Sequence, residues 1–301
     1  MGEPPLDRSP HGRHTAAMAE QVSSQVAANA TAERDAGVAE SIRFRDAFEA
    51  MPKGRTFALP RSRRLVGDLL AYWKTVPCVT QHRRLHIPRL ASTRPQMTRR
   101  ISWPVMFAKA HALVAAEMPE LRRLYLGWPW ARLYEHPTSA CRMTVSREVD
   151  GNDAVFMSRT FDVEQTPLTE FDDEIRFLAT TPIDDVPLFQ RQLKLASVPT
   201  LLRRLMWKAA ANLSGPLRVN FLGTFMVTTV SKWDVVSLTP PVISNATLSF
   251  GRVDADGFVD AYLVYDHRAF DGALNAQALL RLEQMLDGPI CDELIALQPD
   301  R

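Results

Sequence analysis

One histidine and one aspartate near the C-terminus stand in a pattern that can do proton chemistry. His267 and Asp271 lie in residues 265–272, which read YDHRAFDG. The apolar alternation of residues 258–265 predicts a strand before them, and the helical spacing of apolar residues over 273–286 predicts a helix after them. A histidine at a strand-to-helix corner has rigid support, and an unperturbed imidazole pKa of about 6.5 suits a base that works near neutral pH. The pattern predicts a general base at His267.

A bare His-x-x-x-Asp is more often a polar loop, but this string carries more information. YDHRAFDGA followed by an amphipathic helix resembles the active-site segment of the 2-oxo acid dehydrogenase acyltransferases, the dihydrolipoamide acyltransferases. It is more distantly similar to the His-x-x-x-Asp-Gly segment of chloramphenicol acetyltransferase. The resemblance implies a chloramphenicol acetyltransferase-like α/β fold: a two-layer sandwich with a mixed sheet, helices on one face, and a homotrimer with active sites between neighbouring subunits. It extends over residues 55–297 and is strongest at the C-terminal end.

A second segment carries the expected oxyanion donor. Residues 220–230, NFLGTFMVTTV, resemble the family's Gly-Thr-Phe-Thr-Ile-Ser segment, whose serine hydrogen-bonds the oxyanion. Counting from Phe225, Thr228 takes the place of that serine, and Thr229 or Ser231 would take it if the register shifts. A threonine hydroxyl can donate the same bond, although its methyl group restricts χ1. A β-branched strand residue without a catalytic role is an equal alternative.

The resemblance implies a CoA-dependent acyltransferase with acyl-CoA as co-substrate. His267 would take the proton of a hydroxyl, thiol or amine acceptor as the acceptor attacks the thioester. Thr228, from the adjacent subunit, would stabilise the oxyanion. Asp271 would order the corner through an arginine, although each candidate arginine also fits a solvated helix face. These candidates are Arg61, Arg63 and Arg64.

Two other functions remain open. One is a non-catalytic trimeric scaffold, which the threonine at position 228 and an insertion near residue 200 favour and which the presence of His267 and Asp271 opposes. The other is a core subunit that joins a 2-oxo acid dehydrogenase-type complex in trans. No lipoyl domain is recognisable, so no lipoyl group is expected on this chain, and the acceptor would be a small molecule or carrier-bound. Residues 298–301 lack an apolar anchor, which favours an isolated trimer over a cage.

Composition narrows the alternatives. The 301 residues, 46% of them hydrophobic, can bury a large core without disulfide bonds or bound metal ions. Three scattered cysteines, Cys78, Cys141 and Cys291, indicate neither a disulfide framework nor a zinc site, so a reducing, cytoplasmic location is expected. His82 and His86 lie in a predicted strand without a third ligand, so they are expected to be surface residues rather than metal ligands. No apolar run is long enough to span a membrane.

The charge is unevenly distributed although the net formal charge is only +2. Residues 51–100 hold twelve Lys and Arg against one acid, or +11, and residues 145–187 hold eleven acids against three Arg, or −8. No nucleic-acid-binding motif accompanies the basic stretch, so no nucleic-acid partner is expected. An anionic thioester such as coenzyme A, or packing between subunits, fits this distribution better.

Two regions are predicted along the chain. Residues 1–50 have few large apolar side chains and are expected to be a mobile tail, with a helix over 16–51 as the alternative. Residues 51–301 are expected to form the catalytic domain, opening with a helix that ends near Trp73 and a strand over 79–87. A later helix over 103–118 should be capped by Ser102, and one over 169–179 by Thr166 or Thr169. Gly288-Pro289 should end the helix after the motif.

The segment at about 183–217 departs from the family and predicts inserted amphipathic helices broken at Pro199. One apolar stripe is expected on the second helix, with basic residues opposite. The stripe consists of Leu201, Leu202, Leu205, Met206 and Ala209, and the basic residues are Arg203, Arg204 and Lys208. A lid or a subunit contact is favoured over a membrane surface, because three charges form a thin polar face for lipid.

Overall fold

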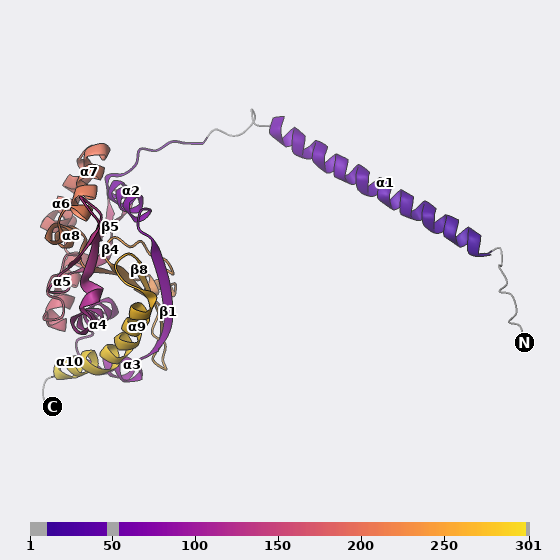
Figure 1. Ribbon diagram of the computed structural model, residues 1–301. Helices are drawn as coiled ribbons and strands as arrows, with labels where there is room; N and C mark the ends of the chain where they lie inside the picture. The colour runs from indigo at the N-terminus through magenta and orange to yellow at the C-terminus, as the bar shows by residue number, and fades with distance from the viewer. Residues whose placement is uncertain (1–10, 47–53, 299–301) are drawn as a thin grey trace, which may run out of the picture. The chain divides into compact units, whose positions relative to one another are not determined.

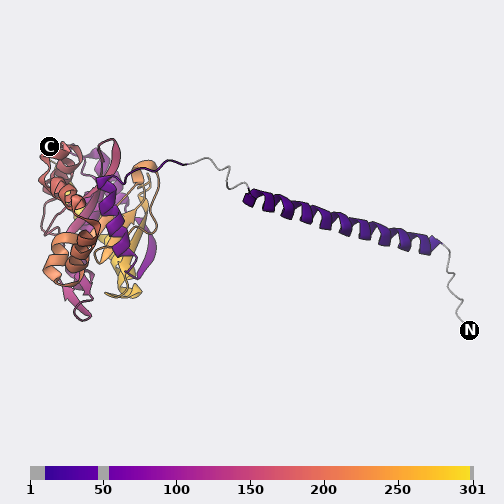
Figure 2. The same cartoon turned by 90° about the horizontal axis from the view of Figure 1, so that it is seen from above.

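The computed structural model describes residues 11–46 and 54–298, which divide into two units at residues 58 and 59. In the first unit, α1 (His11–Asp46) is one uninterrupted helix of 36 residues (Figure 2). Its described apolar side chains, among them Met18, Val22 and Val26, are exposed. The helix that was the alternative for this region therefore forms as far as Asp46, and the remainder of the range 16–51 lies outside the described residues. The mobility of the region stays a prediction.

The second unit is built on a mixed six-stranded sheet with the strand order β1-β8-β7-β6-β4-β5. The β4–β6 and β6–β7 pairs are parallel and the other pairs are antiparallel. The strands are β1 (Cys78–His86), β4 (Cys141–Val149), β5 (Asn152–Met157), β6 (Phe225–Thr228), β7 (Ala246–Phe250) and β8 (Phe258–Asp266). A separate hairpin pairs β2 (Arg123–Leu126) with β3 (Arg132–Glu135).

A layer of helices covers one face of this sheet (Figure 1). Its members are α4 (Trp103–Glu117), α5 (Leu168–Thr180), α9 (Gly272–Met285) and α10 (Cys291–Ala296). Phe225 and Val227 of β6 point into the core between sheet and helices, because alternate residues of a strand share a face. This arrangement confirms the predicted α/β sandwich with a mixed sheet.

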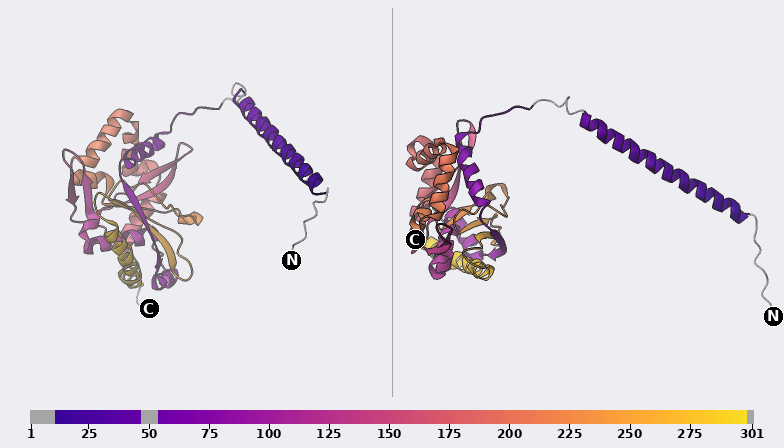
Figure 3. Two further views of the ribbon diagram at one scale, coloured as in Figure 1. Left: turned by 45° about the vertical axis from the view of Figure 1, so that its right-hand side comes forward. Right: turned by 45° about the horizontal axis from the view of Figure 1, so that its top comes forward.

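The remaining helices lie on both sides of the sheet. The helices α2 (Arg61–Trp73), α7 (Thr200–Asn212) and α8 (Gly215–Leu222) pack on the other face. The helix α6 (Pro187–Ser197) packs with α5 against β4 and β5, and the short α3 (Pro88–Thr93) packs into the main core beside α10. Met226, between the two core residues of β6, packs with Leu69 of α2, Ala211 of α7 and Leu222 of α8. Figure 3 shows the purple α2 beside the orange inserted helices. The insertion thus packs on α2 and also, through Ala211, directly on the sheet. The predicted break at Pro199 is confirmed.

The three basic residues predicted opposite the apolar stripe of α7 differ in burial. Arg203 is buried and pairs with the buried Asp68 of α2, whereas Arg204 and Lys208 are exposed. The Arg203 guanidinium also donates to the carbonyl oxygens of Ala196 and Val198. The leucines of the stripe are exposed in this chain. A buried carboxylate on the neighbouring helix requires a cation, and that requirement decides which face of α7 turns inward.

The predicted helix caps are also wrong in detail. Ser102 precedes α4, but its side chain forms no cap, and its backbone N–H donates instead to Asp172 Oδ1 at 2.9 Å. The helix α5 begins after Pro167 without a side-chain cap from Thr166 or Thr169.

Gly288-Pro289 does not end the C-terminal helix as predicted. The chain passes through one wide helical turn, Leu286–Ile290, and continues as α10. Pro289 has no backbone N–H to donate to an earlier carbonyl group, and the wider turn lets the chain continue without that hydrogen bond. Among the described residues, none of the helices combines the length and the apolar character needed to cross a membrane.

Candidate active site

His267 stands at the rim of the sheet, between the end of β8 and the start of α9. Its backbone N–H donates to the carbonyl oxygen of Pro77 at 3.0 Å, which ties the corner to the residue before β1. Its imidazole is 44% exposed, so a substrate can reach it. The sequence placed this residue correctly.

The residues on either side of His267 brace the corner, and sequence reasoning missed them. Asp266 is buried and accepts from Arg268 Nε at 2.8 Å, from Nη2 at 2.7 Å and from the Arg268 backbone N–H at 3.1 Å. The Arg268 guanidinium also lies 4.3 Å above the ring of Tyr125. Burial is the largest single effect and lowers the pKa of Arg268, but the hydrogen bonds to Asp266 and the negative charge of Asp266 together outweigh it, so the pKa lies above the ordinary value. The only sequence signal was the Asp-x-Arg spacing around the histidine.

Asp271 lies one helical turn from His267, with 3.7 Å between Asp271 Oδ1 and His267 Nδ1. Its carboxylate is exposed to solvent at the start of α9. The ion pairs of the described residues join Asp271 to none of the three predicted partners on α2, which were Arg61, Arg63 and Arg64. The nearby arginine of the motif is instead held by Asp266.

Gly272 is required by close approach rather than by a special backbone angle. A Cβ atom at this position would lie 2.8 Å from Gln81 Nε2 and 3.2 Å from the Tyr265 hydroxyl. The Tyr265 ring stacks on Phe270 with 4.9 Å between centroids, and its centroid lies 5.5 Å from that of His267. Burial, and then the negative charge of Asp271, raise the pKa of the Tyr265 phenol. These contacts fix the first turn of α9 against β1 and β8.

Thr228 ends β6 and is half-buried. Its Oγ1 lies 3.0 Å from Thr144 Oγ1 of β4, and either hydroxyl can be the donor. The alternative Thr229 already donates to the carbonyl oxygen of Phe250 at 2.9 Å and accepts from the backbone N–H of Ser231 at 3.1 Å. Of these two threonines, Thr228 therefore keeps more hydrogen-bonding capacity for a substrate.

The sheet register keeps Thr228 and His267 apart within one chain. Thr228 lies in the same row as Ser249 and Tyr262, and His267 follows β8 five residues beyond that row. Five residues of a strand span about 17 Å, and the two strand spacings between β6 and β8 add about 10 Å across the sheet. The two predicted catalytic groups therefore do not meet in a single chain.

The two histidines of β1, His82 and His86, each contact a neighbouring strand residue. His82 Nε2 lies 2.7 Å from Asp260 Oδ1, and the His86 ring stacks on Phe258. Within the ranges 11–46 and 54–298, His, Cys, Asp and Glu form no group of three that can hold a metal ion. The three cysteines are free, and burial is the main cause that raises the pKa of the half-buried Cys78 thiol.

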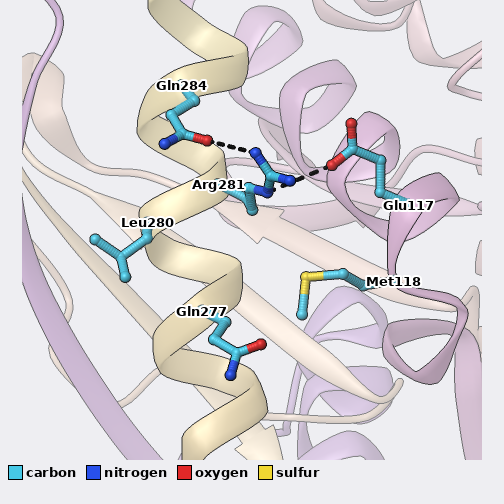
Figure 4. Close-up of a pocket in the computed structure, with 6 residues that line it drawn as sticks. All are labelled: Glu117, Met118, Gln277, Leu280, Arg281 and Gln284. Carbon is cyan, nitrogen blue, oxygen red and sulfur yellow. Dashed lines mark hydrogen bonds and ion pairs between the residues drawn. The ribbon is translucent and has the colours of Figure 1, made fainter.

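Two hollows on the described part of the chain are lined by residues other than His267 and Thr228. One of about 370 Å³ lies between the end of α4 and the exposed side of α9. In it Arg281 donates to Gln284 at 2.8 Å and pairs with Glu117 at 3.5 Å (Figure 4). The other, of about 410 Å³, lies between α2 and the α6–α7 junction.

Comparison with solved structures identifies the fold. A probable dihydrolipoamide acetyltransferase from Listeria monocytogenes 4b F2365 matches with a TM-score of 0.54 and 15% identity, over 78% of this chain and 94% of that chain. The cubic core of the pyruvate dehydrogenase multienzyme complex matches with a TM-score of 0.53 and 19% identity, over 79% of this chain and 97% of that chain. A truncated catalytic core of the 2-oxoacid dehydrogenase multienzyme complex from Thermoplasma acidophilum matches with a TM-score of 0.54 and 15% identity, over 78% of this chain and 99% of that chain. No family model and no curated protein matches the sequence. The comparisons confirm the fold expected from the resemblance.

Proposed function

We propose that this protein is a CoA-dependent acyltransferase that moves an acyl group from a thioester to a hydroxyl, thiol or amine acceptor. The observation that carries the proposal is the exposed imidazole of His267 at the rim of a sheet, in a corner that the neighbouring Asp266–Arg268 pair braces. The fold is shared with acyltransferase cores of 2-oxo acid dehydrogenase complexes. An accessible histidine on such rigid support is the arrangement that general-base catalysis requires.

In the proposed reaction His267 acts as the base. A neutral imidazole nitrogen takes the proton of the acceptor as the acceptor attacks the carbonyl carbon of the thioester. When the tetrahedral intermediate collapses, the carbon–sulfur bond breaks and the proton passes from His267 to the departing thiolate of coenzyme A. Proton and charge therefore balance without a covalent enzyme intermediate. Asp271 Oδ1, 3.7 Å from His267 Nδ1 and one helical turn away, can help to orient the ring.

Thr228 is the proposed donor to the oxyanion of the intermediate. If Thr144 donates in the Thr144–Thr228 pair, the Thr228 hydroxyl proton is left free to face the developing charge. Because the register separates Thr228 from His267 in one chain, the donor would come from a second copy. A closed ring of copies provides such a junction at every subunit, which supports the expected homotrimer.

The test is release of free coenzyme A thiol from acetyl-CoA and longer acyl-CoA substrates. Acceptors would be dihydrolipoamide and a panel of alcohols and amines. His267→Ala should reduce turnover by about 10²-fold or more, because the base is removed. His82→Ala is the matched control, since His82 is also an exposed histidine beside a carboxylate but lies on β1. Wild-type turnover by His267→Ala would exclude this mechanism.

A trimeric scaffold without catalysis is the second candidate. The hydrogen bond between Thr228 and Thr144 favours it, because it gives the threonine a purely structural use. Assembly into rings without turnover on any substrate pair would support the scaffold. Co-purification with a 2-oxo acid dehydrogenase would instead support a role as a core subunit that acts in trans.

A further inference from the structure

Helix α7 turns a row of large apolar side chains outward. The exposed fractions are 84% for Leu201, 51% for Leu202, 62% for Leu205 and 43% for Met206. We call these four residues the α7 ridge. The opposite side of the helix, with Arg203, Ala210 and Ala211, is buried against α2 and the sheet. The ridge therefore points away from the folded unit that carries it.

Two exposed tryptophans stand at the C-terminal end of the same helix. Trp128 and Trp130, 60% and 69% exposed, lie in the turn of the β2–β3 hairpin. Arg132 Nη2 donates to the carbonyl oxygen of Leu213 at 2.8 Å, and the Arg132 Nη1 atom donates to those of Trp128 and Trp130. The backbone N–H of Gly127 donates to Asn212 Oδ1 at 3.3 Å. These bonds hold the tryptophan turn beside the end of α7.

The charge of this surface has a single sign. No Asp or Glu occurs between Pro187 and Trp233. Arg204 and Lys208 are exposed along one flank of the α7 ridge, and Lys194 is exposed on the preceding helix. The nearest carboxylate on α2, Asp68, is buried between Arg203 and Arg204 and is already paired. An anionic partner would therefore meet cations and no acidic side chain from α6, α7 or α8.

We propose that the α7 ridge and the tryptophan turn bind an anionic phospholipid surface. A helix lying in the plane of a membrane inserts large apolar side chains below the headgroups and keeps Arg and Lys at the level of the lipid phosphates. Tryptophan prefers that same interfacial depth. The exposed Arg204, Lys208 and Lys194 complement the negative charge of such a surface. A contact with a second copy of the chain is the alternative that the test distinguishes.

The inference concerns the outer side of the inserted helices and does not rest on the proposed acyl transfer. The sequence favoured a lid or a subunit contact, because the three charges of α7 form a thin polar face for lipid. The structure adds the tryptophan turn, which hydrogen bonds hold beside the end of α7. No spanning helix is needed, since in-plane binding uses only one helix face.

Flotation of the full chain with vesicles tests the proposal. Vesicles of phosphatidylcholine with an equal share of phosphatidylglycerol should bind the protein, and pure phosphatidylcholine vesicles should bind it much less. Binding should weaken as salt is raised, because ionic attraction to the headgroups is screened. The double variants Leu201→Glu/Leu205→Glu and Trp128→Ser/Trp130→Ser should each bind at least about tenfold more weakly.

The control is Phe177→Ser, which removes an exposed apolar side chain from α5. This control should bind as the wild type does, and circular dichroism melting curves should show that every variant is folded. Failure of the wild-type chain to float with the anionic vesicles would overturn the proposal, and so would unchanged binding by both double variants. A smaller particle mass for the ridge variant in light scattering would also overturn it, because the ridge would then be a contact between copies.

Discussion

At the scale of single residues, His111 is a buried titratable group whose protonation opposes folding. It lies in α4 with its ring 4.5 Å from that of Phe225, and its Nε2 atom has no hydrogen-bond partner. Burial lowers its pKa to about 4. The unfolded chain, with a histidine pKa of about 6.5, binds more protons between these two values than the folded chain does. The free energy of unfolding therefore falls as the pH drops from about 6.5 to about 4.

Replacing His111 by phenylalanine should remove this acid sensitivity. Between pH 7 and pH 5 the wild type should lose about 2 kcal/mol of unfolding free energy that the His111→Phe variant keeps. Urea unfolding followed by tryptophan fluorescence at pH 7, 6 and 5 measures the difference. Parallel loss of stability in both proteins would show that His111 does not titrate on unfolding as its burial implies.

The sequence identified the residues that can react but not those that hold them. His267 was found because its strand, turn and helix are local patterns within residues 258–286. The Asp266–Arg268 pair was not found, because two charged residues in a polar turn usually face water. The Arg268 guanidinium is also covered by Tyr125, which comes from a hairpin far away in the sequence.

At the scale of elements, the same limit explains α7. Periodicity predicted an apolar side and a basic side of the helix, but it could not show that Arg203 is buried. Its burial depends on Asp68, more than 100 residues earlier, whose buried carboxylate requires a cation. The end of the helix after the motif also depends on a contact with a residue far away in the sequence. Asp287 Oδ1 accepts from the Leu90 backbone N–H at 2.9 Å, and this anchor supports the turn that carries the chain past Gly288-Pro289.

The Asp68–Arg203 pair yields a prediction for how α7 is held to α2. Asp68→Ala should lower the free energy of unfolding by about 3–5 kcal/mol, because it leaves the buried Arg203 without a counter-charge. Arg204→Ala is the matched control, since Arg204 is exposed and lies 3.5 Å from the same carboxylate. It should cost about 0–1 kcal/mol.

Urea denaturation measures the free energy of unfolding of these two variants and of the double variant Asp68→Leu/Arg203→Met. The comparison separates the effect of an unpaired buried charge from that of lost packing. The double variant removes both charges and should recover much of the loss, because buried pairs are often replaceable by apolar side chains. A cost for Asp68→Ala as small as that of the control would mean that water reaches Arg203.

At the scale of the whole molecule, the sheet register leads to a prediction about assembly. His267 and Thr228 are about 17 Å apart along the strands, so a site that uses both needs two chains. Thr228→Ala should by itself reduce turnover on the order of 10²-fold if its hydroxyl stabilises the oxyanion. A loss below about threefold would instead assign Thr228 to packing with Thr144.

Mixed assemblies of the two inactive variants distinguish a shared site from a site within one chain. His267→Ala and Thr228→Ala chains carrying different tags would be co-expressed and purified on both tags in turn, so that every oligomer contains both variants. In a closed ring of three, one junction then joins an intact His267 to an intact Thr228 of the next copy, and about one third of wild-type turnover should return. Each variant expressed alone with both tags is the control. Turnover in the mixture no greater than in these controls would mean that the two side chains do not meet across a subunit junction, because any junction with both groups intact should be active.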